Sequence, residues 1–325
     1  MAYTIRDVSR LAGVSTATVS RTFTAPERVS PKARQSVMEA ARILNYQPNA
    51  IARSMARQQT ERVAFLICKQ GSGILDEFYA GICEGIMHEI NASDYQLLIS
   101  TAEEWEIVKQ KQVDGVILGG QATPALVSEF QAQKIPIVLV NNEVQGTKLP
   151  CVLNDEEEGV RMAVRHLAER GHMKIGMIVG RLSPYIYGKR YDAFQKVMKE
   201  LQLPVRNGYI RSSDPAVGTA AETAMELLTM EDPPTAVFGA NDVLATGVIK
   251  AAIRLGRRIP EDVAVVGFDD SSVCGSLEPE MTSVHICKHE MGIRSARLLL
   301  ELLKGAENGA DLQVVPPRIV VRDST

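Results

Sequence analysis

The sequence predicts an all-α N-terminal unit of three short helices with helix-turn-helix spacing, followed by an α/β body of two lobes with parallel sheets. The chain has 325 residues, enough for about two domains and a small appendage. Residues 1–60 carry nine Lys or Arg against three acidic residues, a net charge of +6, whereas the remaining residues sum to −9. Apolar residues recur at helical spacing in this basic segment, and beyond it short apolar runs alternate with helical segments.

The composition excludes several classes of protein. Hydrophobic residues make up 45% of the chain and charged residues 23%, close to the globular average. No apolar run approaches the ~18 residues of a membrane helix, and the first ten residues lack the apolar core of a signal peptide. Five scattered cysteines fit buried thiols in a reducing compartment better than a disulfide framework. We therefore expect a soluble cytoplasmic protein without a membrane partner.

The first two helices follow from apolar spacing and from stop and start signals. The first is expected over residues 5–12, where Ile5, Val8 and Leu11 share one face and Gly13 ends the helix. The second is expected over 16–22 behind Ser15, because serine is a good N-cap. About three residues including a glycine separate the two helices, which is the spacing of a helix-turn-helix.

The third helix is expected to begin at Ser30-Pro31 and to run to about residue 45, since a cap followed by proline at the first helical position is a strong start signal. On the second helix Thr16, Ala17, Ser20 and Arg21 should face outward. Short hydroxyl and methyl groups with one arginine can enter a major groove, where arginine reads guanine and methyl groups meet thymine. A small helical bundle with a merely solvated polar face is the alternative.

The body is expected to contain two series of strands and helices. The strands fall at 63–68, 95–100, 113–118, 137–140 and 151–153, and then at 174–179, 205–210, 236–238 and 263–268. The helices fall near 76–90, 103–110 and 124–133, and then near 157–170, 188–201, 217–228 and 242–255. Residues 282–285 should cross back between the lobes, a helix at 290–303 should return to the first lobe, and a strand at 318–321 should join the second. Two such series indicate two similar lobes with a ligand between them, at the carboxyl ends of the strands.

Several segments resemble the lactose-repressor (LacI/GalR) family of transcriptional regulators. The headpiece likeness lies in residues 4–8 (TIRDV), 12–21 (AGVSTATVSR), 29–30 and 44–55 (LNYQPNAIARSM). The body likeness lies in 166–172, 239–247 and 260–270 (PEDVAVVGFDD), patterns that related periplasmic sugar-binding proteins share. The resemblance implies a helix-turn-helix headpiece and a periplasmic-binding-protein-like body.

For DNA, the resemblance implies a double-stranded, pseudo-palindromic operator bound by a homodimer. Thr16, Ala17 and Arg21 fall where the family reads bases, and Met55 falls where a hydrophobic wedge enters the minor groove. The expected DNA-binding residues are Thr4, Ser15, Thr16, Ala17, Thr18, Ser20, Arg21, Asn49, Ala52, Arg53, Met55 and Arg57. Independently of the family, residues 49–57 form too short a helix to be stable alone, since isolated helices below ~12 residues are marginal in water. This hinge should fold only against a partner surface, with Arg53 and Arg57 placed to meet phosphates; a plain linker is the alternative.

For the effector, the resemblance implies a small, sugar-like molecule between the lobes. Arg190 matches the arginine that grips effector polar groups, Asn241 and Asp269 match an amide and a carboxylate, and Asn141 falls where some members place an aspartate. Arginine donors opposite amide and carboxylate acceptors suit a polyhydroxylated ligand. Three of these residues also have a purely structural interpretation: Arg190 as part of an ion pair, Asn241 as an amide that stabilises its loop, and Asp269 as the cap of a turn.

The remaining candidate effector residues stand where the family often has aromatic rings. Ile74 and Leu75 follow the first strand at the position of an aromatic pair, and Ser213 stands where a ring often floors the sugar. Tyr185 or Tyr187 is then the ring available to stack on a sugar.

These expectations divide the chain into a headpiece at 1–48, a hinge at 49–60 and a two-lobed effector-binding and dimerisation domain at 61–325. Lobe 1 is expected over about 61–156 and 289–314, and lobe 2 over about 157–286 and 316–325. We expect a homodimeric repressor whose affinity for the operator is controlled by an effector.

No catalytic motif, metal site or cofactor is expected. The chain has no GxGxxG or P-loop after a strand and no GxSxG, HExxH or CxxC. Two other classes remain open: a solute-binding protein with the same lobes, and an α/β enzyme with an accessory DNA-binding head. The basic head argues against the first, and the missing catalytic motifs argue against the second.

Overall fold

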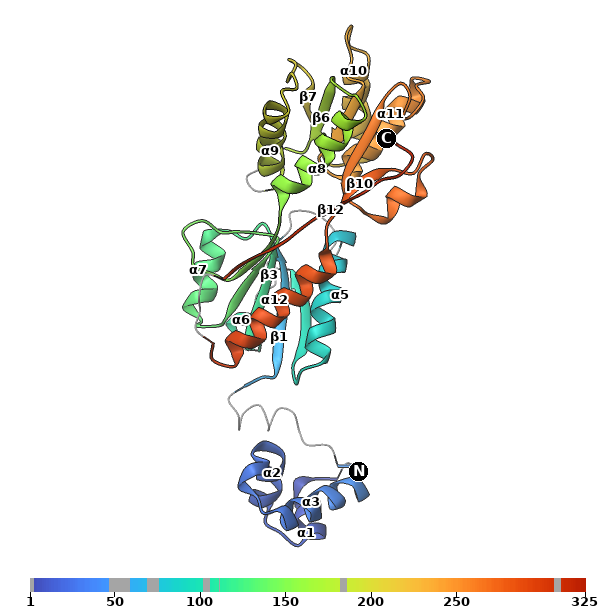
Figure 1. Ribbon diagram of the computed structural model, residues 1–325. Helices are drawn as coiled ribbons and strands as arrows, with labels where there is room; N and C mark the ends of the chain where they lie inside the picture. Colours follow the sequence, from blue (N-terminus) through green and yellow to red (C-terminus); the bar gives the residue numbers. More distant parts are fainter. Residues whose placement is uncertain are drawn as a thin grey trace.

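The computed structural model describes residues 3–46, 59–68, 76–101, 106–110, 112–181, 186–306 and 311–325. Within these ranges it contains a helical headpiece and two α/β lobes (Figure 1). The fold is therefore of the predicted class. No helix in the described ranges is long and apolar enough to span a membrane.

The headpiece consists of α1 (Ile5–Ala12), α2 (Thr16–Thr24), the 3-10 turn η1 (Pro26–Arg28) and α3 (Pro31–Ile43). Gly13 ends α1 with φ +66°, and Ser15 caps α2 by accepting a hydrogen bond from the Thr18 backbone N–H at 3.1 Å. Val8, Val19 and Val37, one from each helix, are fully buried against one another. The headpiece thus has a small core of its own, and the predicted helices and caps are confirmed.

Lobe 1 is built on a six-stranded parallel sheet with the strand order β11-β5-β4-β3-β1-β2. The strands are β1 (Arg62–Cys68), β2 (Gln96–Thr101), β3 (Gly115–Gly120), β4 (Ile137–Val140), β5 (Cys151–Asn154) and β11 (Leu312–Val315). The helices are α5 (Glu77–Asn91), α6 (Glu106–Lys109), α7 (Pro124–Ala132) and α12 (Lys288–Leu303). Residues of β3 and β4 are buried throughout, as expected for strands covered by helices on both faces.

Lobe 2 repeats this arrangement with the strand order β12-β10-β9-β8-β6-β7. The strands are β6 (Ile175–Val179), β7 (Ile210–Ser212), β8 (Ala236–Gly239), β9 (Ala264–Asp269), β10 (Thr282–His285) and β12 (Arg318–Val320). The helices are α8 (Glu156–Glu169), α9 (Ile186–Glu200), α10 (Val217–Leu228), α11 (Asp242–Arg254) and the 3-10 turn η3 (Ser272–Ser276). All pairs are parallel except β10 with β12.

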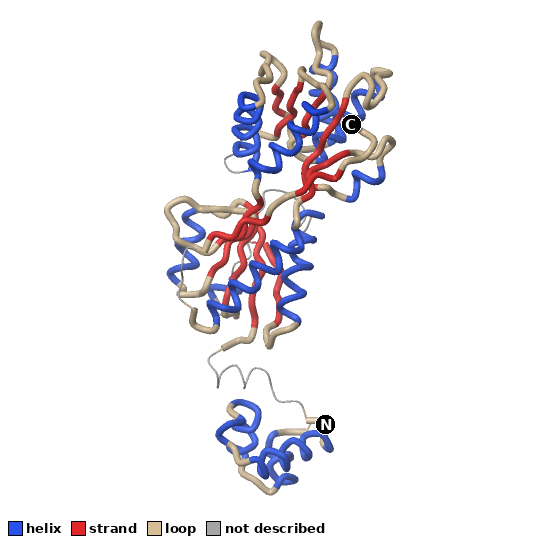
Figure 2. The backbone as a smooth tube through the Cα atoms, viewed as in Figure 1, coloured by secondary structure: helices blue, strands red, loops and turns tan. Residues whose placement is uncertain are grey.

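In the described residues the chain passes between the lobes at three places: from β5 to α8, from β10 to α12 and from β11 to β12 (Figure 2). These crossings place α12 against lobe 1, as predicted. They also bring the carboxyl ends of both sets of parallel strands toward the interval between the lobes.

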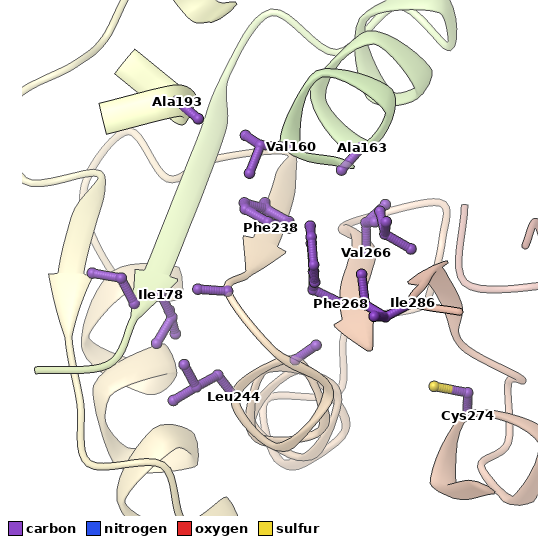
Figure 3. Close-up of a cluster of buried hydrophobic side chains, with 14 of the residues drawn as sticks. Val160, Ala163, Ile178, Ala193, Phe238, Leu244, Val266, Phe268, Cys274 and Ile286 are labelled. Carbon is purple, nitrogen blue, oxygen red and sulfur yellow. The ribbon is translucent and has the colours of Figure 1, made fainter. Parts of the chain in front are cut away.

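The core of lobe 2 lies beneath this interval. Phe238 and Phe268 stand on adjacent strands with ring centroids 6.2 Å apart, close to Ile178, Leu244 and Ile286 (Figure 3). A Cβ at Gly159 of α8 would lie 2.6 Å from the Phe268 ring, so this helix packs directly on the aromatic pair. The packing fixes the end of β9, where Asp269 begins the loop that faces the other lobe.

Three strands differ from the prediction. Residues 282–285, expected to cross between the lobes, form β10 in the sheet of lobe 2, and the crossing follows them. Residues 205–209 are not a strand, because Asn207-Gly208 form a turn with Gly208 at φ +81°, and β7 begins only at Ile210. Strand β11 was not predicted, although it pairs in parallel with β5 along four residues. Leu312 and Val314 are exposed although they are apolar, so the pairing partner rather than the local pattern makes this segment a strand.

Candidate functional site

The outer face of α2 carries the predicted base-reading side chains. Thr16, Ala17 and Arg21 are exposed, Ser20 is partly exposed, and Val19 between them is fully buried. The helix therefore presents a polar strip backed by the headpiece core. Such a strip, with one arginine and short side chains, has the size and chemistry for a major groove.

A hollow of about 490 Å³ borders this strip. It is lined by Ser15 and Ser30, the N-caps of α2 and α3, and by the guanidinium groups of Arg21 and Arg28. Two helix N-termini and two cations favour an anion such as a DNA phosphate. Thr18 is part of the same wall, and its hydroxyl lies 2.9 Å from that of Ser15.

Thr4 lies at the start of α1. Its backbone N–H and hydroxyl donate to the Asp7 carboxylate at 2.9 and 2.7 Å, and the backbone bond is the main cause of the lowered pKa of Asp7. Thr4 therefore fixes the helix start. The predicted hinge residues Asn49, Ala52, Arg53, Met55 and Arg57 lie outside the described residues.

A second candidate site is a cleft of about 630 Å³ between the lobes. Its polar walls come from loops that directly follow parallel strands, as expected for ligand sites in α/β folds. Lobe 1 contributes Cys68, Asp76, Phe78, Tyr79, Gly120, Gln121, Asn141 and Asn142, and lobe 2 contributes Arg181, Ile186, Tyr187, Arg190, Asp214, Pro215, Asn241 and Asp269. Four of the predicted effector residues, at positions 141, 190, 241 and 269, are thus brought together.

Arg190 is the most enclosed of these groups, with 3% of its surface exposed. Its Nε donates to Glu156 at 2.6 Å, its Nη2 to Asp269 at 3.3 Å, and its Nη1 to the Ala240 carbonyl at 2.5 Å. The guanidinium carbon lies 3.7 Å from the centroid of the Phe268 ring. Guanidinium has five N–H groups, and a second Nη2 bond reaches Glu156, so one N–H on Nη1 has no partner among the described residues.

Two neighbouring carboxylates keep the Arg190 side chain positively charged. Burial alone would lower the pKa of Arg190, but the carboxylates of Glu156 and Asp269 more than offset this and raise it above its ordinary value. The arginine is therefore a fixed cation in the cleft wall, held by a buried ion pair with Glu156.

Asp269 has an unusual backbone and an unusual acidity. Its φ is +105°, a conformation that costs about 1–3 kcal/mol for a residue with a side chain. Burial raises the pKa of this carboxyl to about 7, against the opposing effect of Arg190 and with a further rise from Asp242. Near neutral pH a ligand hydroxyl could therefore meet either a donor or an acceptor here.

The two predicted amides are held by different means. Asn241 caps α11 by accepting from the Leu244 N–H at 2.9 Å, and its Nδ2 donates to the Tyr187 hydroxyl at 3.0 Å. Asn141 is buried with φ +53° and its side chain contacts the Tyr79 hydroxyl. Burial raises the pKa values of Tyr79 and Tyr187 to about 12, so both rings present neutral hydroxyl groups.

Of the other predicted effector residues, Ser213 is described by the structure and does not line the cleft. Ser213 is buried, and its hydroxyl donates to the Asp214 carbonyl at 3.0 Å, while its neighbours Asp214 and Pro215 line the cleft. Ile74, Leu75 and Tyr185 lie outside the described residues. Tyr187 does line the cleft.

Sequence reasoning missed several lining residues. Phe78 and Tyr79 supply aromatic rings from the first turns of α5, with centroids 5.4 Å apart, a few residues after the position where rings were sought. Glu156, which pairs with Arg190 behind the cleft wall, was not among the predicted effector residues, and its side chain is only 9% exposed. The Asn142 side chain is also buried, and its Nδ2 has no hydrogen-bond partner among the described residues. Asn142 lines the cleft, so a bound ligand could supply the acceptor that this buried amide lacks.

Both parts of the chain match known protein families. Residues 4–49 match bacterial regulatory proteins of the lacI family, and residues 164–325 match a periplasmic binding protein-like domain. The chain is 32% identical to catabolite control protein A of Priestia megaterium, with 100% of each chain covered. It is 30% identical to the HTH-type transcriptional repressor PurR of Vibrio cholerae serotype O1, with 99% of this chain and 97% of that one covered.

Solved structures of similar fold superpose on this chain along its whole length. A Lac repressor dimer bound to operator and the anti-inducer ONPF superposes with a TM-score of 0.84 at 26% identity, covering 100% of this chain and 99% of that one. A complex of the transcriptional regulator CelR with cellobiose superposes with a TM-score of 0.75 at 28% identity, covering 99% of this chain and all of that one.

Proposed function

Because the chain belongs to the LacI family of bacterial regulatory proteins, it is a DNA-binding transcriptional regulator, and we propose that it represses transcription under the control of a small polar metabolite. The observation that carries this proposal is the combination of an exposed recognition strip on α2 with a polar cleft between two lobes. The headpiece would occupy residues 1–48, the hinge 49–60 and the two-lobed domain 61–325.

The recognition helix α2 would lie in a major groove, as the second helix of a helix-turn-helix does. Thr16, Ala17 and Arg21 would contact base edges, and Arg21 has the geometry to reach guanine. The remaining predicted DNA-binding residues would position the headpiece and hinge through phosphates and groove edges. These are Thr4, Ser15, Thr18, Ser20, Asn49, Ala52, Arg53 and Arg57.

The hinge at 49–57 would become helical only on DNA. Two Met55 side chains, one from each subunit of a homodimer, would enter the minor groove at the centre of a pseudo-palindromic operator. Unstacking one base step costs a few kcal/mol, which the contacts made possible by the bend offset. Methionine is unbranched and flexible, so the wedge should tolerate more than one central step.

The effector would be a polyhydroxylated molecule such as a sugar or sugar derivative, as cellobiose is for CelR. Asn142 Nδ2 and the remaining Arg190 N–H offer donors, while Asp269 offers an acceptor. The rings of Phe78 and Tyr187 border the same space and can pack on the apolar face of a sugar. Asn141 and Asn241 orient the two tyrosine hydroxyl groups, and Ser213 would act only by holding the Asp214 backbone.

Closure of the lobes on this ligand would change how the two hinges of the dimer are presented to DNA. Such coupling is reciprocal: if the effector changes operator affinity by a given factor, the operator changes effector affinity by the same factor. We further propose that the protein works in the cytoplasm and catalyses no reaction, since the cleft groups described above are arranged to hold a ligand. A solute-binding protein would have no use for the headpiece.

A thermal-shift screen tests the effector proposal. Sugars, sugar phosphates, sugar acids and nucleosides are added singly, and a compound that binds the folded cleft raises the melting temperature by mass action. We expect a hit among the polyhydroxylated compounds, lost in Asn142→Leu and retained in the surface variant Glu222→Gln. A hit of equal size in the Asn142→Leu and Arg190→Met variants would place the ligand elsewhere and contradict the assignment.

A further inference from the structure

The loop that follows Asp269 makes direct contacts with lobe 1. Ser272, at the start of η3 in lobe 2, donates its backbone N–H to Glu77 Oε1 at 2.6 Å and its hydroxyl to Glu77 Oε2 at 2.9 Å. Glu77 is the first residue of α5 in lobe 1, and 195 positions separate the two residues in the sequence. Beside this bond, Lys288 Nζ at the start of α12 donates to the Asp270 carbonyl at 3.4 Å.

On the side of lobe 2, the same loop is tied to the effector cleft. Asp269 lines the cleft, and Asp269 and Asp270 both have positive φ values, which turns the chain sharply after β9. Ser271 then donates its N–H and hydroxyl to the buried Asp242 at 2.7 and 2.8 Å, and Ser283 donates to the same carboxylate at 2.6 Å. The loop is therefore anchored to lobe 2 on both sides of its turn and has little freedom to move independently.

On the side of lobe 1, Glu77 stands between two cleft residues, Asp76 and Phe78. Its helix α5 packs backbone to backbone on α12: a Cβ at Gly85 would lie 2.0 Å from the His289 carbonyl, and one at Gly292 would lie 2.0 Å from the Ile82 carbonyl. A contact this close cannot slide without separating the helices. A displacement of Glu77 therefore moves α5 and α12 together.

We propose that Glu77 is a positioning residue that holds the two lobes closed through Ser272 and links the effector loop to the α5–α12 pair. A carboxylate that accepts two hydrogen bonds from one residue forms stronger bonds than neutral groups do, and both bonds break when the lobes separate. The closed arrangement gains from these bonds while the open one does not, so the contact shifts the equilibrium between them. The regulatory consequence of this shift rests on the proposed function, but the contact itself does not.

Amide hydrogen exchange tests the contact in the full-length protein. In Glu77→Asp the charge at the start of α5 is kept, but the side chain is one methylene shorter and should no longer reach Ser272. We expect the Ser272 amide to exchange about tenfold faster in this variant, as the loss of one charge-assisted hydrogen bond implies. The Ser271 amide, which donates to Asp242 instead, is the internal control and should be unchanged.

Small-angle X-ray scattering tests the closing role, which a local structural role would not affect. Glu77→Asp and Glu77→Ala should both raise the radius of gyration above that of wild type, and Glu84→Ala, at an exposed position of the same helix, should not. Ser272→Ala, which keeps the backbone donor, should give an intermediate value. Equal scattering in all four variants, or equal Ser272 exchange in Glu77→Asp and wild type, would overturn the proposal. Neither readout uses DNA or an effector, so the outcome is independent of whether the regulatory function is correct.

Discussion

At the scale of single residues, the cleft shows how position changes the role of a familiar side chain. Arg190 is the arginine that the sequence pattern assigns to the effector, but four of its five N–H groups already bind Glu156, Asp269 and the Ala240 carbonyl. It therefore contributes mainly a fixed charge and one N–H without a partner in the described part of the chain. Removing Glu156 alone would take away the shortest ion-pair contact of a buried cation, and breaking a buried pair in this way typically costs about 3–5 kcal/mol.

The acidity of Asp269 predicts a pH dependence of stability. Because its pKa is raised to about 7, the protein binds a proton more tightly when folded. The stability that this group contributes is present below pH ~4 and is lost as the pH rises through about 7. Asp269→Asn cannot ionise, so we expect it to gain stability relative to wild type, by up to a few kcal/mol, between pH 5 and pH 8.

Denaturant unfolding at several pH values measures this difference. Asp262→Asn is the control, because hydrogen bonds from Arg258 lower the pKa of Asp262 to about 2 and the wild-type carboxylate is ionised throughout the range. Its difference from wild type should be constant from pH 5 to pH 8. A constant difference in stability between Asp269→Asn and wild type over the same range would show that Asp269 is already ionised at pH 5.

Arg21 predicts a specificity effect rather than a general loss of affinity. Arg21→Ala should weaken operator binding by ~1–3 kcal/mol and relax discrimination at one base pair in each half-site. Binding to an operator selected from genomic fragments, and to its single-base variants, measures both quantities. Equal losses on every sequence would instead place Arg21 on the phosphate backbone.

At the scale of elements, the strands and helices with strong local signals were predictable from the sequence, and those that depend on a distant partner were not. Helix α2 follows from a cap, a glycine stop and apolar spacing, all within a few residues. Strand β11 becomes a strand because β5 lies beside it, with each paired residue 161 positions earlier in the sequence. The same distinction applies to the residues of the cleft. Asn241 and Asp269 stand at or just after strand ends and could be predicted from the sequence, whereas the roles of Glu156 and Asn142 became recognisable only from the positions of both lobes.

The α5–α12 contact predicts a large penalty for a small substitution. Gly292→Ala would place a methyl group 2.0 Å from the Ile82 carbonyl, so we expect a loss of stability of about 1–3 kcal/mol or more. Gly218→Ala on α10 meets nothing within 4 Å and should be neutral or slightly stabilising, because alanine favours helix by up to ~1 kcal/mol. Thermal unfolding of both variants measures the difference, and equal stability of the two would mean that the helices are not packed at backbone distance.

At the scale of the whole molecule, a basic headpiece is joined to an acidic two-lobed body. The net charge of +6 over residues 1–60 against −9 over the rest directs DNA to one end of the chain. The net negative charge of the body repels a polyanion, so in the proposed function its effect on DNA passes through the proposed hinge and the arrangement of the dimer. This division explains why the sequence predicted the two functions well but left the effector itself open: the cleft reveals hydrogen-bonding chemistry, and many polyols share it.

The hinge predicts the salt dependence of binding. Arg57→Gln should weaken binding to all duplex sequences alike and reduce the magnitude of the slope of log Kobs against log[salt] by about 1 per subunit, as expected for one lost phosphate contact. Fluorescence anisotropy over a range of KCl concentrations measures the slope. A change in base preference without a change in slope would argue that Arg57 reads sequence instead.

The most direct measurement of effector-controlled DNA binding is competitive retention of genomic fragments on the purified full-length protein at moderate salt, with and without the cleft ligand from the thermal-shift screen. A DNA-binding regulator should retain a few fragments that share a pseudo-palindromic site over random duplex, and the ligand should change their retention but not that of random DNA. If genomic and random duplex were retained to the same extent and the ligand changed neither, the protein would not be an effector-controlled DNA-binding regulator.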